Sequence, residues 1–178
     1  PKPVQKPHIP IYIGAIEDPA IKRAGRLGFP LLIGPLRTTQ MIKDTIDTYN
    51  NAARQAGKNP EGIEHILMRR VHIAGDKKTA KEEADEYIIG MYRFFLGLGV
   101  KMSVRGKELT SPDDPMFDYL AEDRFIIGDP EDCIREVKRY TDELGINYIL
   151  CTMKFPKGTH EIISRCIEHF GKEVISKI

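Results

Sequence analysis

The sequence contains little cysteine, little net charge and no long apolar run. Its three cysteines, Cys133, Cys151 and Cys166, show no Cys-x-x-Cys spacing, a pattern typical of buried thiols in a reducing compartment. The formal net charge is +1, so bulk electrostatics does not favour a nucleic-acid partner. No apolar run approaches the roughly 18 residues of a membrane span, and no charged-then-apolar leader is visible. We therefore expect a cytoplasmic protein that neither binds nucleic acid nor enters a membrane.

The most informative segment covers residues 8–35, where an apolar run, a small-residue turn, a helix and a second apolar run follow one another. The β-branched residues at 9–13 predict a strand, which ends at Gly14. Asp18 as the N-cap and Pro19 at the first helical position predict the start of the helix. Backbone N–H groups at a turn between a strand and a helix can receive a phosphate.

Apolar periodicity and turn residues predict alternating helices and strands along the rest of the chain. The predicted elements after the second strand are a helix capped by Thr38 or Thr39, a strand at 63–74, a helix capped by Asp76, an irregular stretch at 97–123, a helix opened by Asp129 and Asp132 as a capping box, a strand at 146–153 and a helix capped by Thr159. Residues 1–8 are rich in proline and lysine and predict an extended lead-in.

This order of elements predicts an α/β fold in which helices connect parallel strands by right-handed crossovers. Four such units are half of a (β/α)8 barrel or, alternatively, a small open α/β sheet. Periodicity alone does not choose between these two architectures.

Several segments together resemble the C-terminal half of the luciferase-like flavin monooxygenases. They are PIYIGA with DPAIKRAGRLGFPLLIG, YNNAARQAGKNPEGI, RRVHIAGDKKTAKEEA, FIIGDPEDCIREVKRYTDELGINYILC and HEIISRCIEHFGKEVI. The resemblance implies half of a (β/α)8 TIM-type barrel, strands 5–8, with an insertion near residues 97–124. Residues 1–178 would then be a single domain, a C-terminal half-barrel fragment. The chain starts with Pro1 rather than Met, which also indicates a processed, cut or excerpted piece.

The resemblance implies an enzyme that binds reduced FMN, or coenzyme F420 in some branches, at the carboxyl-end mouth of the barrel. An FMN enzyme of this kind uses O2 to oxidise a small organic substrate, whereas an F420 enzyme transfers a hydride. We expect the fragment alone to be inactive. A non-enzymatic alternative is a half-barrel that associates with itself or with its missing half, because open strand edges and apolar faces promote association.

The turn after the first predicted strand would, by this resemblance, lie against the cofactor phosphate. Its residues are Gly14, Ala15, Ile16, Glu17 and Asp18, leading into Ala20. Bacterial luciferase has hydroxyl side chains in this region, whereas this sequence has none between Tyr12 and Thr38. Backbone N–H groups and the helix dipole would therefore carry more of the binding. The carboxylates of Glu17 and Asp18 would repel a phosphate if they faced it.

Polar residues of the strand at 63–74 are further candidates. Arg69 and Arg70 point to opposite faces of a strand. Arg70 is a candidate contact for the cofactor phosphate or for an internal carboxylate, and a structural salt bridge is the alternative. His72 shares the face of Arg70 and is either a catalytic base or a structural histidine. His65 lies near the strand start, where such barrels place residues for stability.

The last predicted strand ends near Cys151, which we interpret as a small buried residue rather than a reactive thiol. Met153 and Phe155 follow it. They line an apolar pocket for the substrate or the isoalloxazine ring or, alternatively, pack within an ordinary loop. The charge run at 76–86 predicts a solvated helix face with i,i+4 pairs. His160 and His169 stand nine residues apart without a carboxylate cluster, so no metal site is predicted. The sequence names no catalytic base.

Overall fold

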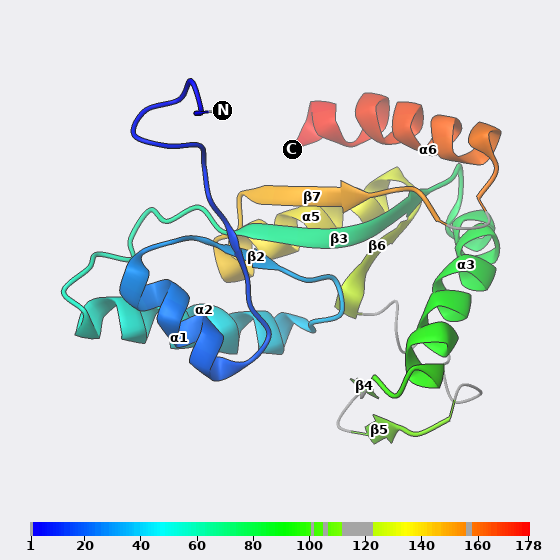
Figure 1. Cartoon of the computed structure of the whole chain (residues 1–178). Helices are drawn as coiled ribbons and strands as arrows, with labels where there is room; N and C mark the ends of the chain where they lie inside the picture. Colours follow the sequence, from blue (N-terminus) through cyan, green and yellow to red (C-terminus); the bar gives the residue numbers. More distant parts are fainter. Residues whose placement is uncertain (1, 101, 105–106, 112–122, 156–157) are drawn as a thin grey trace. The chain divides into compact units, whose positions relative to one another are not determined.

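The computed structural model describes residues 2–100, 102–104, 107–111, 123–155 and 158–178, and helices alternate with strands along most of them (Figure 1). The strands are β1 (Ile13–Gly14), β2 (Leu31–Ile33), β3 (Ile66–Ile73), β4 (Met102–Val104), β5 (Lys107–Leu109), β6 (Phe125–Gly128) and β7 (Tyr148–Thr152). The helices are α1 (Asp18–Leu27), α2 (Thr39–Gln55), α3 (Lys77–Gly97), α5 (Pro130–Leu144) and α6 (His160–Glu173), followed by the 3-10 turn η1 (Ile175–Lys177). None of the described helices combines the length and the apolar character needed to cross a membrane.

Parallel pairing joins the strands of the main sheet. β1 pairs with β2, β2 with the start of β3, and the end of β3 with β6, all in parallel. β7 also pairs with β3. A separate antiparallel pair joins β4 to β5. Parallel strands connected by helices agree with the α/β fold that the sequence predicts.

The chain divides into two compact units. The first unit comprises Pro1–Met68 with Leu144–Leu150, and the second comprises Arg69–Glu143 with Cys151–Ile178. β3 and β7 each have residues in both units.

Two close-packed helices form the core of the first unit. The buried residues Ile21 and Ala24 of α1 face α2, where Ile42 and Tyr49 are fully buried. Gly25 allows this approach, because a Cβ at its position would lie 2.5 Å from the carbonyl oxygen of Tyr49. The helical spacing of these apolar residues explains why the two helices share one interface.

The core of the second unit lies where α3 contacts the strand pair β3–β6. Val71 and Ile126 are fully buried in this pair, and Ile88 is fully buried on α3. The ring of Tyr92 on α3 meets the ring of Phe125 edge-on, with 5.9 Å between the centroids. The short apolar strand β6 is therefore part of the core.

Side-chain caps begin most of the helices as the sequence predicts. The side chains of Thr38, Asp76 and Thr159 accept backbone N–H hydrogen bonds at the starts of α2, α3 and α6. At the start of α5, the carboxylate of Asp129 accepts from the N–H of Asp132 at 2.9 Å. The prediction for α1 was wrong: Glu17, not Asp18, is its N-cap, and it makes no side-chain cap hydrogen bond.

Several strand predictions also need correction. β6 was missed because four apolar residues directly before a helix resemble a helix lead-in. The antiparallel pair β4–β5 was missed in the stretch at 97–123, much of which lies outside the described residues. The first strand is shorter than predicted and covers only Ile13–Gly14, since Pro10 has no N–H to donate to a neighbouring strand. β3 and β7 are also shorter at both ends than the predicted strands.

Candidate functional site

The turn after β1 carries most of the residues that the sequence suggests for cofactor binding. Ala15 is buried, whereas the side chains of Ile16, Glu17 and Asp18 are exposed and Ala20 is half-buried. The guanidinium of Arg37, in the loop after β2, donates a hydrogen bond to the carbonyl oxygen of Ile16. A cation therefore lies beside this acidic turn, a contact that the sequence did not predict.

Two glycines at the carboxyl ends of β1 and β2 leave free space beside the main chain. Gly14 ends β1 and Gly34 follows β2, and no atom lies within 4 Å of the place that a Cβ would occupy at either residue. Neither glycine has a positive φ. Packing and backbone conformation therefore do not demand glycine here, and the space allows a ligand to approach the main chain closely.

The first turn of α1 offers few N–H donors to a ligand. Pro19 has none, and the N–H groups of Ala20 and Ile21 donate to the carbonyl oxygen of Glu17 at 2.9 and 3.1 Å. The carboxylate of Asp18 lies 3.9 Å from the ammonium of Lys22. An anion at this turn would thus depend on the strand-end backbone and on a nearby cation more than on the helix start.

The neighbouring arginines of β3 differ in their surroundings. Arg69 is fully buried, and its guanidinium carbon lies 4.7 Å from the ring centroid of Tyr140 on α5. Arg70 is half-buried, and its Nε is buried without a hydrogen-bond partner in the described residues. Burial lowers the pKa of Arg70 below its ordinary value. The Nε of Arg69 is likewise buried without a hydrogen-bond partner in the described residues, so the two arginines differ in their burial and in the contact of Arg69 with Tyr140.

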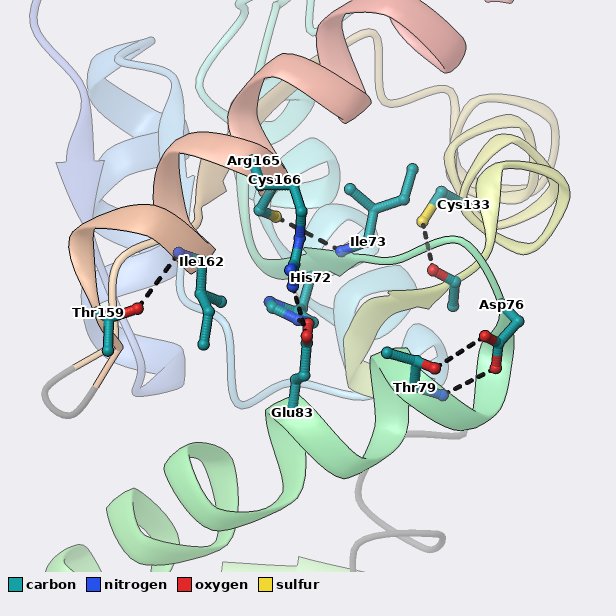
Figure 2. Close-up of polar contacts among 11 residues, drawn as sticks. His72, Ile73, Asp76, Thr79, Glu83, Cys133, Thr159, Ile162, Arg165 and Cys166 are labelled. Atoms are coloured by element: carbon teal, nitrogen blue, oxygen red, sulfur yellow. Dashed lines mark hydrogen bonds and ion pairs between the residues drawn. The ribbon is translucent and has the colours of Figure 1, made fainter.

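His72 belongs to a buried hydrogen-bonded group in the second unit (Figure 2). Its side chain is 1% exposed, and its Nε2 lies 2.8 Å from a carboxylate oxygen of Glu83 on α3. The other oxygen of Glu83 accepts a hydrogen bond from Arg165 on α6. Burial opposes ionisation of Glu83, but hydrogen bonds from His72 and Arg165 outweigh it, so the pKa of Glu83 lies below its ordinary value. This geometry favours the structural interpretation of His72.

Glu83 corrects the prediction that residues 76–86 form a fully solvated face. Lys78 and Glu82 do form an exposed i,i+4 pair at 3.9 Å, as expected. The side chain of Glu83 is only 19% exposed. Helical spacing could have found it, because Glu83 lies three residues after Ala80, an apolar residue that is fully buried.

His65 is a buried hydrogen-bond acceptor at the start of β3. Its Nδ1 accepts the backbone N–H of Leu31 at 3.0 Å, and its ring packs edge-on against Tyr49. Burial lowers the pKa of His65 to about 4. The imidazole is therefore neutral at physiological pH and serves the structure.

The three cysteines are not activated thiols. Cys133 and Cys166 are buried, Cys151 is half-buried, and none forms a disulfide. Burial raises the pKa of Cys133 to about 12 and that of Cys151 to about 11, and it also raises the pKa of Cys166. Since the thiolate is the nucleophilic form, these side chains are poor nucleophiles at neutral pH.

The residues after β7 have contrasting environments. Met153 is half-buried, whereas Phe155 is buried and its ring lies edge-on to His72, with 6.1 Å between the centroids. None of the cofactor or substrate candidates lines the shallow depression on the outer side of α5, which is bordered by Glu131, Ile134, Arg135, Lys138, Arg139, Asp142 and Glu143. In the part of the chain that the structure describes, no three His, Cys, Asp or Glu side chains are grouped to hold a metal ion.

Comparison with known proteins identifies the family. The model of the luciferase-like monooxygenase family matches residues 1–147. The chain belongs to the luciferase-like monooxygenase family. A relative with 26% identity over 153 residues, covering 80% of this chain and 42% of its own length, is an F420-dependent glucose-6-phosphate dehydrogenase of Mycolicibacterium gilvum.

Solved structures of this family share the fold. The monooxygenase RslO1 of Streptomyces bottropensis matches with a TM-score of 0.77 and 17% identity, over 99% of this chain and 50% of that one. The oxygenating component of 3,6-diketocamphane monooxygenase, encoded on the CAM plasmid of Pseudomonas putida and solved with FMN, matches with a TM-score of 0.65 and 20% identity, over 90% of this chain and 46% of that one. These luciferase-like structures confirm the α/β half-barrel that the sequence predicts. The chain spans 42% to 50% of the length of the curated relatives it matches.

Proposed function

We propose that this luciferase-like chain is part of a flavin-dependent monooxygenase that uses reduced FMN and O2 to oxidise a small organic substrate. The observation that carries the proposal is the turn after β1, where open backbone at Gly14 lies near the strand end and the guanidinium of Arg37 is bonded to Ile16. Family membership supports the reaction class, and the FMN-bound relative supports the cofactor.

The residues at this turn fit a phosphate that approaches from the strand end. Arg37 supplies a planar cation suited to phosphate oxygens, and the absence of a Cβ at Gly14 leaves room beside the main chain. Glu17 and Asp18 are exposed, so solvent screens the repulsion between their carboxylates and a bound phosphate. A bound reduced flavin supplies the electrons for oxygen activation, whereas these residues only bind and orient it.

Arg70 is the second proposed cofactor contact. Its side chain is half-buried, and its buried Nε has no hydrogen-bond partner within the described residues. A buried donor without a partner costs free energy, and an anionic group would relieve that cost. Met153 stays a proposed substrate contact because it is half-buried directly after β7. Phe155 contributes through packing, as its ring is covered.

An F420-dependent hydride transfer is the second candidate, favoured by the F420-dependent relative. The same cation and open backbone would suit a phosphate of either cofactor, so these contacts do not separate the two. A half-barrel that only associates with itself or with a complementary half is the non-enzymatic candidate.

Titration of the purified chain with FMN and, separately, with F420 tests these proposals through cofactor fluorescence. We expect FMN to bind more tightly than F420, and Arg37→Gln to weaken binding about fivefold to twentyfold because a charge-assisted hydrogen bond is lost. Arg23→Gln, an exposed arginine on α1, is the matched control and should leave the affinity unchanged.

Tighter binding of F420 would favour hydride transfer. No binding of either cofactor at high micromolar concentration would favour the non-enzymatic half-barrel. Equal losses in Arg37→Gln and Arg23→Gln would show that Arg37 makes no specific contact.

A further inference from the structure

A series of contacts links Phe155, which follows β7, to Arg165 on α6. Phe155 packs its ring against His72. His72 is bonded to Glu83, and Glu83 accepts a hydrogen bond from Arg165, which lies in the second turn of α6. Figure 2 shows His72, Glu83 and Arg165 converging from β3, α3 and α6. Phe155 and α6 therefore both contact the same histidine–glutamate pair.

A second contact holds α6 on β3 beside this series. The Sγ of Cys166 accepts the backbone N–H of Ile73 at 3.4 Å, and these residues directly follow Arg165 and His72 in the chain. Between β7 and α6, the N–H of Gly158 donates to the carbonyl oxygen of Phe155 at 3.1 Å. Phe155 and Gly158 are thus held to each other, and α6 is held to β3.

The chemistry of the pair defines the state of the imidazole. An ionised carboxylate only accepts hydrogen bonds, so the Nε2 of His72 carries the hydrogen that Glu83 receives. In the neutral ring, Nδ1 then has no hydrogen. Arg165 restrains the carboxylate from its other oxygen, which limits the orientations open to the ring. This arrangement therefore favours one ring orientation, in which Nε2 carries a hydrogen.

We infer that Glu83 is a positioning residue: held by Arg165, it fixes the ring of His72, which seats Phe155 and, with it, the N–H of Gly158 that is bonded to Phe155. Met153, a proposed substrate contact, lies two residues before Phe155, so the significance of the inference for catalysis rests on the proposed function. Glu83 contacts no cofactor or substrate in this role. It acts through His72.

Hydrogen exchange and ¹⁵N NMR of the imidazole test the inference on the purified chain carrying Glu83→Ala. We expect His72 to change from a single Nε2–H tautomer to a mixture. Exchange at the amides of Gly158 and Ile162 should accelerate about tenfold, the scale set by losing a hydrogen bond to a charged group. The amides of Gly28 and Ala56 in the first unit should keep their rates.

Three further variants sharpen the test. Glu82→Ala removes the neighbouring exposed carboxylate and should change neither the tautomer nor the exchange rates. Glu83→Gln can still accept from His72 and should restore the tautomer. Arg165→Gln removes the guanidinium that holds Glu83. Because the side chain of Arg165 is 53% exposed, we expect smaller changes in the tautomer and in the exchange rates than Glu83→Ala causes, in the same direction.

Equal acceleration at all four amides would overturn the inference, because Glu83 would then only stabilise the fold. Unchanged exchange at Gly158 and Ile162 after the tautomer is lost would also overturn it. FMN affinity of Glu83→Ala should stay within about twofold of the original chain, since Glu83 is not a proposed cofactor contact. Failure of the original chain to bind FMN would contradict the proposed function and leave the exchange result standing.

Discussion

His65 lies directly before β3, is 7% exposed and accepts the backbone N–H of Leu31 through Nδ1. Protonation of that nitrogen would break the hydrogen bond and place a charge in an apolar environment. Both effects disfavour the imidazolium, and burial accounts for the lowered pKa of His65, about 4. The same histidine in the unfolded chain has a pKa near 6.5.

This difference predicts a pH dependence of stability. The unfolded chain binds more protons between the two pKa values, so the contribution of His65 is fully present above about pH 6.5 and is lost as pH falls toward about 4. The difference corresponds to about 3 kcal/mol at most. We expect His65→Gln to flatten the curve of unfolding free energy against pH in this window, measured by urea unfolding.

His160→Gln is the control for this prediction, since His160 is exposed on α6. It should leave the slope between about pH 6.5 and about pH 4 unchanged. An equally steep slope in His65→Gln would show that other groups cause the acid sensitivity.

At the scale of elements, the approach of α1 to α2 depends on one missing side chain. A Cβ at Gly25 would lie 2.5 Å from the carbonyl oxygen of Tyr49 and 3.2 Å from the backbone nitrogen of Ala53. Both neighbours are backbone atoms of a helix, so they cannot rotate away as a side chain could. The helices would have to separate to admit a methyl group.

Two glycine-to-alanine substitutions should therefore have opposite effects. Gly25→Ala is expected to lower the free energy of unfolding by about 1 to 3 kcal/mol through overpacking. Gly171→Ala, in α6, is expected to raise it by about 0.5 to 1 kcal/mol, because alanine favours the helix and no atom lies within 4 Å of its Cβ. Urea unfolding of both variants measures the difference, and a stabilising Gly25→Ala would contradict the interface described for α1 and α2.

At the scale of the whole molecule, β7 exposes more apolar surface than a parallel strand usually does. Tyr148 and Leu150 are 43% and 41% exposed, and alternate residues of a strand lie on the same face. Strands of parallel sheets are normally buried on both faces. Such a face favours association with a second copy or with a complementary half-barrel.

We expect the isolated chain to associate rather than stay a monomer of 20.2 kDa. Light scattering after size-exclusion chromatography measures the mass, and Leu150→Lys should shift it toward the monomer by placing a charge on the exposed face. Ile175→Lys alters a similarly exposed residue of η1 and is the control. A well-behaved monomer of the unaltered chain would refute this expectation.

Much of the fold could be predicted because its signals are local. A helix cap such as Thr38 or Asp76 acts on an N–H three residues away, and apolar spacing within one helix identifies its buried face. The order of strands and helices, and segments that resemble one family, then led to the half-barrel. The order of the elements gave the α/β class, and the family resemblance was needed to choose the half-barrel over an open sheet.

Only the tertiary structure showed which distant residues meet. β6 is a strand because its four residues pair with β3, and the sequence of those four residues does not predict this pairing. Glu83 is bonded to Arg165, 82 residues further along the chain, and Arg37 reaches back to Ile16. The sequence by itself therefore determined the local elements and the family, whereas the tertiary structure decided the contacts of the site. The physical reason is that hydrogen bonds and packing between distant segments depend on three-dimensional proximity, which local spacing does not encode.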